Sequence, residues 1–526
     1  MFNVTWARSA LLAFCVCLSA CGGGGGGDPA PPSSDVPAPQ PQPQSASVSV
    51  RSLATDAFIL AIQSPSTSST FQQHGQRLWL AQGAARSASI VSRELGTQGW
   101  LPARTWMTSS AWQPDMIRLF FAGDHVAATW EHEDNTLAGS APTVARVIGP
   151  GTDSGEQIAP VSASTVFNNI ALSPSGLLRV AATNPQTGTW VLTAGQWQSA
   201  TAGGIAHLSI DFWDEAGNGS ALKSVTTPES GEHLRLMSFD AERGVALDTR
   251  SFANDPDWVP TGEAMAAKLP NGKLLAVARL QSRFSHYARA IAVSEFDGNA
   301  WSPSVHVVES DLPSATHWQI LVDTNQAGHV ALAWGDNRQI FAALRSPAGQ
   351  WSSARQVLYL YRAGAAYNDI TFIEDLFLKL TPDGRAVLLG TLDGSGRVAD
   401  ADPRLFVTST SDGASWSPVT MATLAGKRVV GLAVQASETV SEVGVLAFVE
   451  RDGVFDTYLA RTEGLSWTEH LLQANKRHRH FPWGLRNGMV LPDNRHVKHS
   501  AERGWEAFWR VEYEPSGSEV FSAQVR

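Results

Sequence analysis

The sequence predicts an all-β protein built from repeated four-stranded antiparallel sheets. Three observations predict it: a recurring strand-and-turn unit, tryptophans at a nearly constant spacing, and no convincing amphipathic helix after position 46. The clearest copy of the unit runs from Ile320 to Val357. Its apolar runs are stopped by Asp, Asn and Gly residues, and a Ser-Pro-Ala-Gly turn precedes its fourth strand, which Trp351 opens.

Tryptophans at the start of the last strand of each unit set the repeat length. Trp301 and Trp351 are 50 residues apart, and Trp416 and Trp467 are 51 residues apart. The repeat tryptophans are Trp100, Trp197, Trp301, Trp351, Trp416 and Trp467. The two longest steps are each close to twice the period, so a copy without its tryptophan is expected in each, at 151–160 and at 234–252.

A period near 50 residues with four strands per copy is typical of a β-propeller, in which radial repetition leaves only short, protected sheet edges. The outer hairpins predict eight blades, with seven as the alternative. The stretch 487–525 has the pattern of an incomplete copy, which we expect to pair with the N-terminal strand and close the ring. A series of β-sandwiches is the rival architecture, but it would need a longer repeat of roughly 100 residues.

The first 20 residues have the features of a secretory signal peptide. Arg8 is their only charged residue, and the apolar run at 10–18 is too short for a permanent membrane span. The tetrapeptide that ends in Cys21, Leu-Ser-Ala-Cys, resembles the lipobox of bacterial lipoproteins. This resemblance implies cleavage before Cys21, acylation of that cysteine and attachment to the cell envelope. Gly22 in the next position favours the outer membrane.

Residues 21–45 predict a disordered tether between the lipid and a folded domain at 46–526. A run of six glycines is followed by a segment rich in Pro, Ala, Ser and Gln. A glycine run behaves as a flexible coil, and a proline-rich run extends as polyproline II at roughly 3 Å per residue. We therefore expect the tether to hold the domain tens of ångströms from the membrane.

Charge and cysteine content exclude several kinds of partner and site. The net charge of −10 disfavours nucleic acid as a partner, because phosphates would be repelled. All three cysteines, Cys15, Cys17 and Cys21, lie in the first 21 positions. The folded domain therefore has no disulfide, no cysteine metal site and no thiol nucleophile. We expect no metal and no cofactor.

The outer hairpins resemble the Asp-box of sialidase-like propellers, Ser-x-Asp-x-Gly-x-Thr-Trp. Residues 409–416 keep the first Ser, the Gly and a final Ser-Trp, with Ser411 where the Asp belongs. Residues 294–301 keep Ser, Gly and Trp, with Asp297 one place late. In that family the box is structural, and its Trp packs between neighbouring blades. The resemblance therefore implies the fold and a packing role for the repeat tryptophans.

The sequence does not carry the catalytic set that the sialidase resemblance would imply. That family uses three arginines, a Tyr nucleophile with a Glu partner and an acid-base Asp, and its Arg-Ile-Pro motif is absent here. We therefore assign no catalytic residue. The expected function is a non-catalytic binding or scaffold module for a glycan or an envelope protein. The alternative is a sialidase-like glycoside hydrolase or lyase that acts at the axial pocket.

One segment near the C-terminus is a candidate site for an anionic ligand. Basic and aromatic side chains over the mouth of a propeller would collect a carboxylate sugar or a phosphate. The candidate residues are Arg477, His478, Arg479, His480, Trp483 and Arg486. The competing interpretation is a solvated connection between the last repeat and the closing strands.

Overall fold

The computed structural model gives the fold as strands joined by short turns. It describes residues 48–52, 69–74, 77–84, 87–94, 104–108, 113–133, 143–160, 166–184, 188–200, 212–213, 219–227, 231–240, 245–251, 257–285, 289–310, 319–335, 339–360, 371–394, 404–421, 424, 428–451, 454–463, 466–476, 495–512 and 518–525. Every regular element in these residues is a β-strand, which confirms the all-β prediction. The chain divides into two units, Met1–Ser45 and Ala46–Arg526, and the described residues belong to the second.

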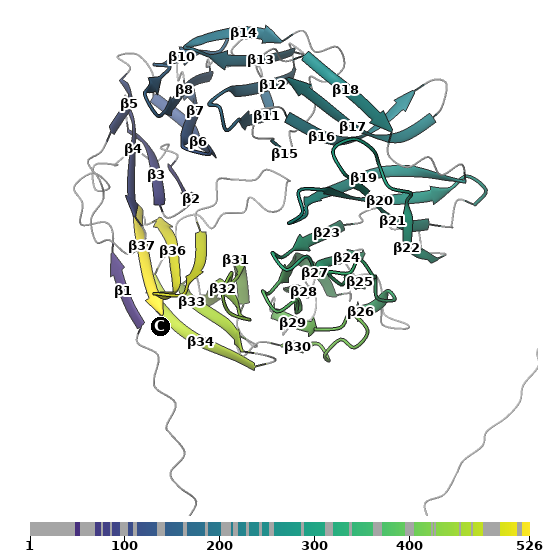
Figure 1. The fold of residues 1–526 in the computed structure, drawn as a ribbon. Coiled ribbons are helices and arrows are strands. Elements are labelled where there is room, and N and C mark those ends of the chain that lie inside the picture. The colour runs from purple at the N-terminus through teal and green to yellow at the C-terminus, as the bar shows by residue number, and fades with distance from the viewer. Residues whose placement is uncertain are drawn as a thin grey trace, which may run out of the picture. The chain divides into compact units, whose positions relative to one another are not determined.

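The described strands form nine antiparallel sheets, eight of four strands and one of five, which follow one another along the chain (Figure 1). The protein is therefore a β-propeller of four-stranded antiparallel blades. The expectation of eight blades, or of seven, was wrong. It treated the C-terminal stretch as an incomplete copy, whereas the three strands there take a fourth from the N-terminus and make a full sheet.

The first four sheets are consecutive in sequence. The first holds β2 (Ser69–His74), β3 (Arg77–Ala84), β4 (Ser87–Glu94) and β5 (Arg104–Thr108). The second holds β6 (Gln113–Ala122), β7 (His125–Glu133), β8 (Thr143–Gly149), β9 (Thr152–Asp153) and β10 (Gln157–Ile158). The third holds β11 (Val166–Leu172), β12 (Leu178–Asn184), β13 (Gly188–Thr193) and β14 (Gln196–Ala200). The fourth holds β15 (Phe212–Trp213), β16 (Gly219–Thr227), β17 (Gly231–Asp240) and β18 (Val245–Ser251).

The next four sheets are also consecutive in sequence. The fifth holds β19 (Trp258–Lys268), β20 (Leu274–Ser282), β21 (Arg289–Phe296) and β22 (Val305–Ser310). The sixth holds β23 (Gln319–Thr324), β24 (Val330–Gly335), β25 (Gln339–Arg345) and β26 (Arg355–Tyr359). The seventh holds β27 (Thr371–Leu380), β28 (Ala386–Gly394), β29 (Arg404–Thr410) and β30 (Thr420–Met421). The eighth holds β31 (Arg428–Ala436), β32 (Val443–Arg451), β33 (Val454–Glu463) and β34 (Ser466–Lys476).

The ninth sheet, which we call the closing sheet, contains both ends of the folded domain. It holds β35 (Arg495–Ser500), β36 (Gly504–Glu512), β37 (Ser518–Val525) and β1 (Val48–Ser52). β1 pairs with β37 in antiparallel register, with Val48 opposite Val525 and Ser52 opposite Phe521 (Figure 1). The sequence predicted this pairing of the C-terminal stretch with the N-terminal strand.

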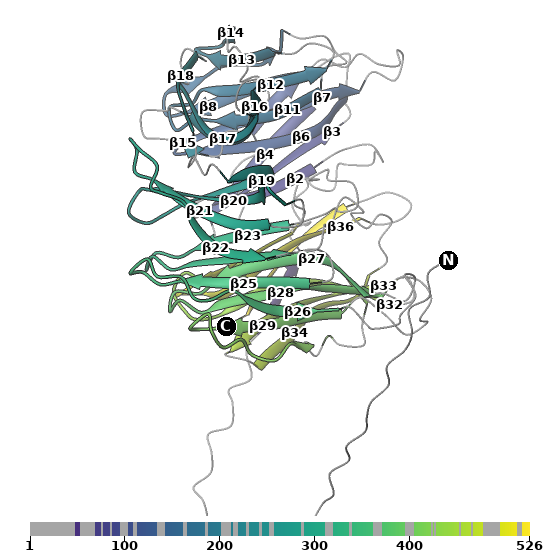
Figure 2. The ribbon, with the colours of Figure 1, turned by 90° about the vertical axis from the view of Figure 1, so that its right-hand side faces the viewer.

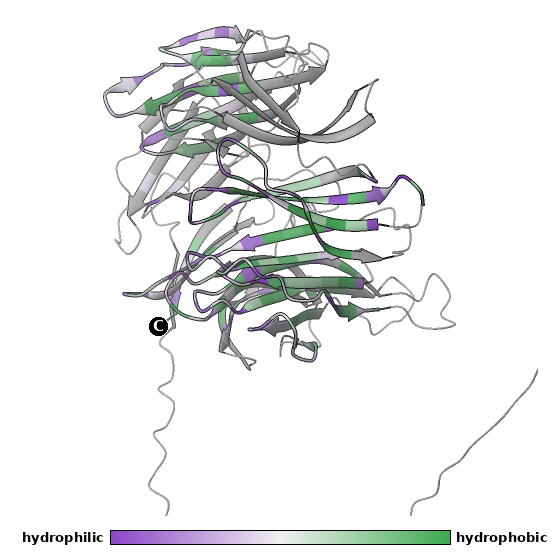
Figure 3. Cartoon of the chain, turned by 45° about the vertical axis from the view of Figure 1, so that its right-hand side comes forward, coloured by the Kyte–Doolittle hydropathy of each residue, from purple (hydrophilic) through white to green (hydrophobic). Residues whose placement is uncertain are grey.

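Neighbouring sheets pack through their first strands, which we call the inner strands. β19 packs on β23, and β23 packs on β27 (Figure 2). β27 packs on β31, β31 packs on β35, and β2 of the first sheet also contacts β35. Hydrophobic residues run along the strands, whereas hydrophilic residues gather in the turns (Figure 3). Each sheet thus has apolar faces that only its neighbours can cover.

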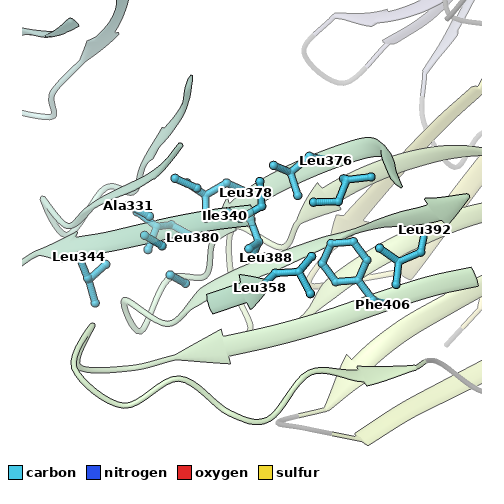
Figure 4. Close-up of a cluster of buried hydrophobic side chains, with 14 residues drawn as sticks. Ala331, Ile340, Leu344, Leu358, Leu376, Leu378, Leu380, Leu388, Leu392 and Phe406 are labelled. Atoms are coloured by element: carbon cyan, nitrogen blue, oxygen red, sulfur yellow. The ribbon is translucent and has the colours of Figure 1, made fainter. Parts of the chain in front are cut away.

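The core consists of hydrophobic clusters between successive sheets. One cluster joins the sixth and seventh sheets and includes Ile340, Leu388 and Phe406 (Figure 4). Leu388 and Phe406 are completely buried, and burial of a side chain of this size contributes about 1.5–3 kcal/mol. Similar clusters join the seventh sheet to the eighth and the eighth sheet to the closing sheet. Stability therefore comes from packing between sheets.

The outer hairpins, between third and fourth strands, are fixed by a serine that follows the repeat tryptophan. The Ser417 N–H donates to the Ser409 carbonyl at 2.8 Å, and Ser417 Oγ accepts the Ser409 N–H at 3.0 Å. Ser154 makes the same two bonds to Val147, each of 2.9 Å, in the second sheet, where the sequence predicted a copy without tryptophan. The other equivalent serines are Ser302 and Ser352.

The aspartate that caps the outer turn stands one residue later than in the Asp-box. Asp412 Oδ1 accepts the N–H groups of Ser415 and Ala414 at 2.8 and 2.9 Å, whereas Ser411 occupies the box position. Asp297 accepts two turn N–H groups in the same way, both at 2.8 Å. These backbone hydrogen bonds favour the carboxylate and lower the pKa of both aspartates.

Candidate ligand-binding face

Each sheet has two different ends, because consecutive strands run in opposite directions. Strands one and two, and strands three and four, are joined at one end, which we call the hairpin end. Strands two and three are joined, and successive sheets are linked, at the opposite end, which we call the loop end. β1 starts at the hairpin end, because Val48 pairs with Val525, the last residue of β37. Val48 therefore lies at the hairpin end of the domain.

The hairpin end is occupied by hydrogen bonds between neighbouring sheets. Asp323, at the end of β23, accepts the N–H of Leu380 in β27 at 2.7 Å. Asn325 Nδ2 donates to the Thr381 carbonyl at 2.9 Å. Burial raises the pKa of Asp323 above the ordinary aspartate value, while the Leu380 N–H acts in the opposite direction. The buried carboxylate thus has a structural partner in the next sheet.

Other hydrogen bonds between neighbouring sheets also join residues that are 56 positions apart. Thr324 Oγ1 donates to the Lys268 carbonyl of the fifth sheet at 3.3 Å. Arg385 of the seventh sheet donates to the Ser441 carbonyl of the eighth. Both pairs are separated by 56 residues in the chain, as is the Asn325–Thr381 pair. The polar groups of this end therefore join the sheets to each other.

A glycine lets two of these hairpins come close together. Gly384 has φ +87°, a conformation that side chains rarely adopt. A Cβ atom there would lie 2.5 Å from the His329 ring of the sixth sheet. The hairpins between first and second strands are thus packed against the adjacent sheet, which leaves the opposite end of the blades as the candidate ligand face.

Five of the described inner strands have a bulge in their first half, on the side of the loop end. Bulges interrupt the pairing of β6, β11, β19, β27 and β31 with the second strands of their sheets. A bulge bends its strand and re-aims side chains, and bulges are over-represented next to active sites. Carboxylic residues occur at three of these five bulges. They are Asp115 in β6, Glu263 in β19, and Glu374 and Asp375 in β27.

The sequence reasoning missed the bulges, although one signal was present in β27. Ile373, Leu376, Leu378 and Leu380 belong to one buried cluster. A regular strand places every second residue on one face. The step of three between Ile373 and Leu376 therefore indicates one extra residue, which is the bulge. Asp375 lies within that step, and its Oδ2 is 3.4 Å from Thr391 Oγ1.

Two aromatic side chains are strongly exposed in the described part of the chain, and both belong to the loop end. Phe284 follows β20 and is 82% exposed, and Tyr359 ends β26 and is 58% exposed. Their sheets, the fifth and sixth, are neighbours. Exposed aromatic rings are costly to leave in water and are common at interaction sites. These two rings are candidate ligand contacts that the sequence did not single out.

The candidate anionic-ligand residues lie outside the described residues. Arg477, His478, Arg479, His480, Trp483 and Arg486 fall between β34 and β35. β34 ends at Lys476, and β35 begins at Arg495. Both of these strand termini are at the loop end. Cys21 also lies outside the described residues.

The repeat tryptophans lie in the packing between strands and sheets. Trp416 packs on the cluster of the sixth and seventh sheets, and Trp467 packs on that of the seventh and eighth. Trp351 and Trp197 occupy the same place in earlier sheets, and Trp301 packs within the fifth sheet. Trp100 lies outside the described residues.

The described strands and turns contain no group of three or more His, Cys, Asp or Glu side chains arranged to hold a metal ion. In the same part of the chain, no helix has the length and apolar character needed to cross a membrane.

Comparison with known proteins leaves the family open. No family model matches the chain, and no curated protein matches it. Three solved structures show how weak the likeness is. The Dos1 propeller is 8% identical (78% of this chain and 96% of that chain, TM-score 0.38). The β-propeller domain of the trilobed protease from Pyrococcus furiosus is 10% identical (79% and 99%, TM-score 0.31). An alpha-L-arabinanase from Penicillium chrysogenum is 11% identical (69% and 93%, TM-score 0.30).

Proposed function

We propose that this protein is an outer-membrane lipoprotein that presents a β-propeller as a non-catalytic binding or scaffold module, with a glycan or an envelope protein as the ligand. The difference between the two ends of the blades carries the proposal. Polar groups of the hairpin end are used between sheets, whereas the loop end carries the bulges and the exposed rings of Phe284 and Tyr359. Loops on a rigid scaffold are the usual place for binding residues.

The anchor in this proposal is Cys21, which resembles the acylated cysteine of lipoproteins. The tether at 21–45 leads to β1, whose first residue Val48 is at the hairpin end. A tether of this length would hold the domain tens of ångströms from the membrane, so that a ligand could reach it. The basic residues between β34 and β35 would add an anionic preference, for a carboxylate sugar or a phosphate.

A glycoside hydrolase or lyase is the second candidate function, and the acidic residues at the bulges favour it. Hydrolysis of a glycosidic bond uses two carboxyl groups, which stand roughly 5–10 Å apart. Glu263 and Asp375 come from the inner strands of the fifth and seventh sheets. Such an enzyme would release new reducing ends from a polysaccharide, and a binding module would not.

Anchoring is tested by the Cys21→Ser variant. We expect the unaltered protein to sediment with membranes and to carry the mass of a diacylglyceryl group and an acyl chain. The variant should carry no lipid mass and should keep residues 1–20, because cleavage in lipoproteins follows acylation of the cysteine. If the unaltered chain carries no lipid mass, or if the variant is still cleaved before position 21, the lipoprotein proposal is wrong.

Binding is tested by retention on polysaccharide, peptidoglycan and envelope-protein matrices. We expect a double variant of the loop end, Phe284→Ala with Tyr359→Ala, to lose about tenfold in affinity, as for truncation of exposed anchor rings. The matched control, Asn271→Ala, changes an exposed residue in a hairpin-end turn of the fifth sheet and should bind normally. A ligand face at the loop end would be contradicted if the unaltered protein were retained on no matrix, or if the double variant and the Asn271→Ala control were retained equally. Release of reducing ends that Glu263→Gln abolishes would favour the enzyme.

A further inference from the structure

The closing sheet meets the eighth sheet at a polar joint built around His499. His499 lies in β35, and its Nδ1 is 2.8 Å from Ser437 Oγ and 3.3 Å from Thr439 Oγ1. Both hydroxyl groups belong to the turn between β31 and β32. The His499 ring also packs on Trp505 of β36, with ring centroids 5.1 Å apart. This joint docks the sheet that holds both ends of the domain.

Hydrogen bonds to Ser437 fix the direction of its bond to His499. Ser437 Oγ accepts the N–H of Thr439 at 3.1 Å and the N–H of Val440 at 3.0 Å. A hydroxyl oxygen has two lone pairs and one proton. Both lone pairs are therefore occupied, and the Ser437 proton can point to His499 Nδ1 at 2.8 Å or to Thr439 Oγ1 at 3.4 Å. The shorter contact selects Nδ1 as the acceptor, so the ring is neutral with its proton on Nε2.

A proton on Nδ1 would break this arrangement. The new N–H would point at an oxygen that has no free lone pair, and only the longer contact to Thr439 Oγ1 could receive it. Arg461 would repel the imidazolium, whereas Glu442 would attract it. Glu442 is already engaged, because its Oε2 accepts Trp505 Nε1–H at 2.8 Å and lies 4.0 Å from Arg461 Nη1.

Other ionisable residues stand on the elements that pack around His499. β2 and β3 of the first sheet meet at His74 and Arg77, and β2 contacts β35. The remaining ones are Glu438 in the turn of the eighth sheet and Lys498, Glu502, Arg503 and Glu506 in the closing sheet. Lys498 is directly opposite Glu506 in the pairing of β35 with β36.

We propose that this joint is a pH-dependent latch, in which the closing sheet stays docked on the eighth sheet while His499 is neutral and loosens when acid protonates it. Burial holds the pKa of His499 below its ordinary value of 6.5. A detached His499 therefore binds a proton more readily than a docked one. Docking is complete above that ordinary value and is lost as the pH falls through the lower pKa of the docked state. The latch is independent of any ligand and of the lipid anchor.

Hydrogen exchange of the full-length chain in detergent, followed by mass spectrometry, tests the latch. After correction for the intrinsic effect of pH, protection of β35 and β36 should fall severalfold between roughly pH 7.5 and pH 5, because the pKa of the docked His499 is lowered. Protection of β24 and β25 in the sixth sheet should change much less and serves as the internal reference. If the protection of β35 and β36 changes with pH no more than that of β24 and β25, the proposal is wrong.

Two variants separate titration of His499 from a merely structural role. His499→Asn places an amide oxygen near the position of Nδ1, so we expect nearly normal protection at neutral pH and no acid loosening. Ser437→Ala removes the donor, so protection should be low at both pH values. His329→Asn, at a hairpin of the sixth sheet, is the matched control. In this variant the protection of β35 and β36 should still fall in acid. If His499→Asn loosens in acid as the unaltered chain does, another group is responsible and the latch is wrong.

Discussion

The Trp505→Ala variant is expected to lose about 3–5 kcal/mol of unfolding free energy, the usual cost of removing a buried tryptophan. Trp505 is 1% exposed and belongs to the cluster that joins the eighth sheet to the closing sheet. Its ring lies directly on the backbone of β32, because a Cβ atom at Gly444 would stand 2.3 Å from it. Alanine would leave a cavity between the two sheets and would remove the indole N–H that donates to Glu442.

Urea-induced unfolding, monitored by tryptophan fluorescence and by circular dichroism, measures the loss. Trp505→Phe is the matched control, since it keeps an aromatic ring between the two sheets but removes the indole N–H and part of the ring volume. We expect this control to cost about 1.5–3 kcal/mol, the usual loss for one hydrogen bond to a charged group. An alanine variant no less stable than the phenylalanine variant would show that the two sheets are not packed as described.

Removal of β1 is expected to cost about 2–5 kcal/mol, because a strand pairing of this length holds several backbone hydrogen bonds worth roughly 1 kcal/mol each. All five residues from Val48 to Ser52 have partners in β37. A chain that begins at Leu53 would leave β37 as an exposed edge strand, which also favours aggregation. A chain that begins at Ala46 keeps the strand and is the control.

Thermal unfolding and size-exclusion chromatography of the two shortened chains measure this effect. The chain that begins at Leu53 should unfold at a lower temperature and form oligomers, while the chain that begins at Ala46 should behave as the full-length domain. Equal unfolding temperatures would mean that β1 contributes nothing to the closing sheet.

The sequence predicted the repeat because its signals are local. Outer hairpins could be placed from tryptophans such as Trp351, and the copy without a tryptophan around 151–160 does contain the hairpin β8–β9. The serine that closes the outer hairpins was also visible in the sequence, since Trp-Ser recurs at 301–302, 351–352 and 416–417. Its role depends on two hydrogen bonds across the turn, which no periodicity reveals.

Contacts between distant parts of the chain could not be predicted in the same way. Asp323 and Thr324 have the appearance of ordinary turn residues, and only the packing of neighbouring sheets gives them partners 57 and 56 residues away. The ninth blade was missed because blades were counted by their outer hairpins, and β37 and β1 pair without a hairpin between them. The candidate basic residues at 477–486 remain a prediction, whereas the exposed Phe284 required a structure to be noticed.

A designed disulfide between β1 and β37 is the most direct test of the closing sheet. Ser49 and Gln524 are opposite each other in the antiparallel pairing, and Cα atoms of such pairs lie about 4.5–5.5 Å apart, within the range of a disulfide. In a chain that begins at Ala46 no other cysteine is present. Oxidation of the Ser49→Cys, Gln524→Cys variant should give monomers with an internal cross-link between these two positions, and Ser49→Cys with Ser353→Cys should not. Free thiols or cross-linked dimers in the first variant would contradict a propeller in which both ends share one sheet.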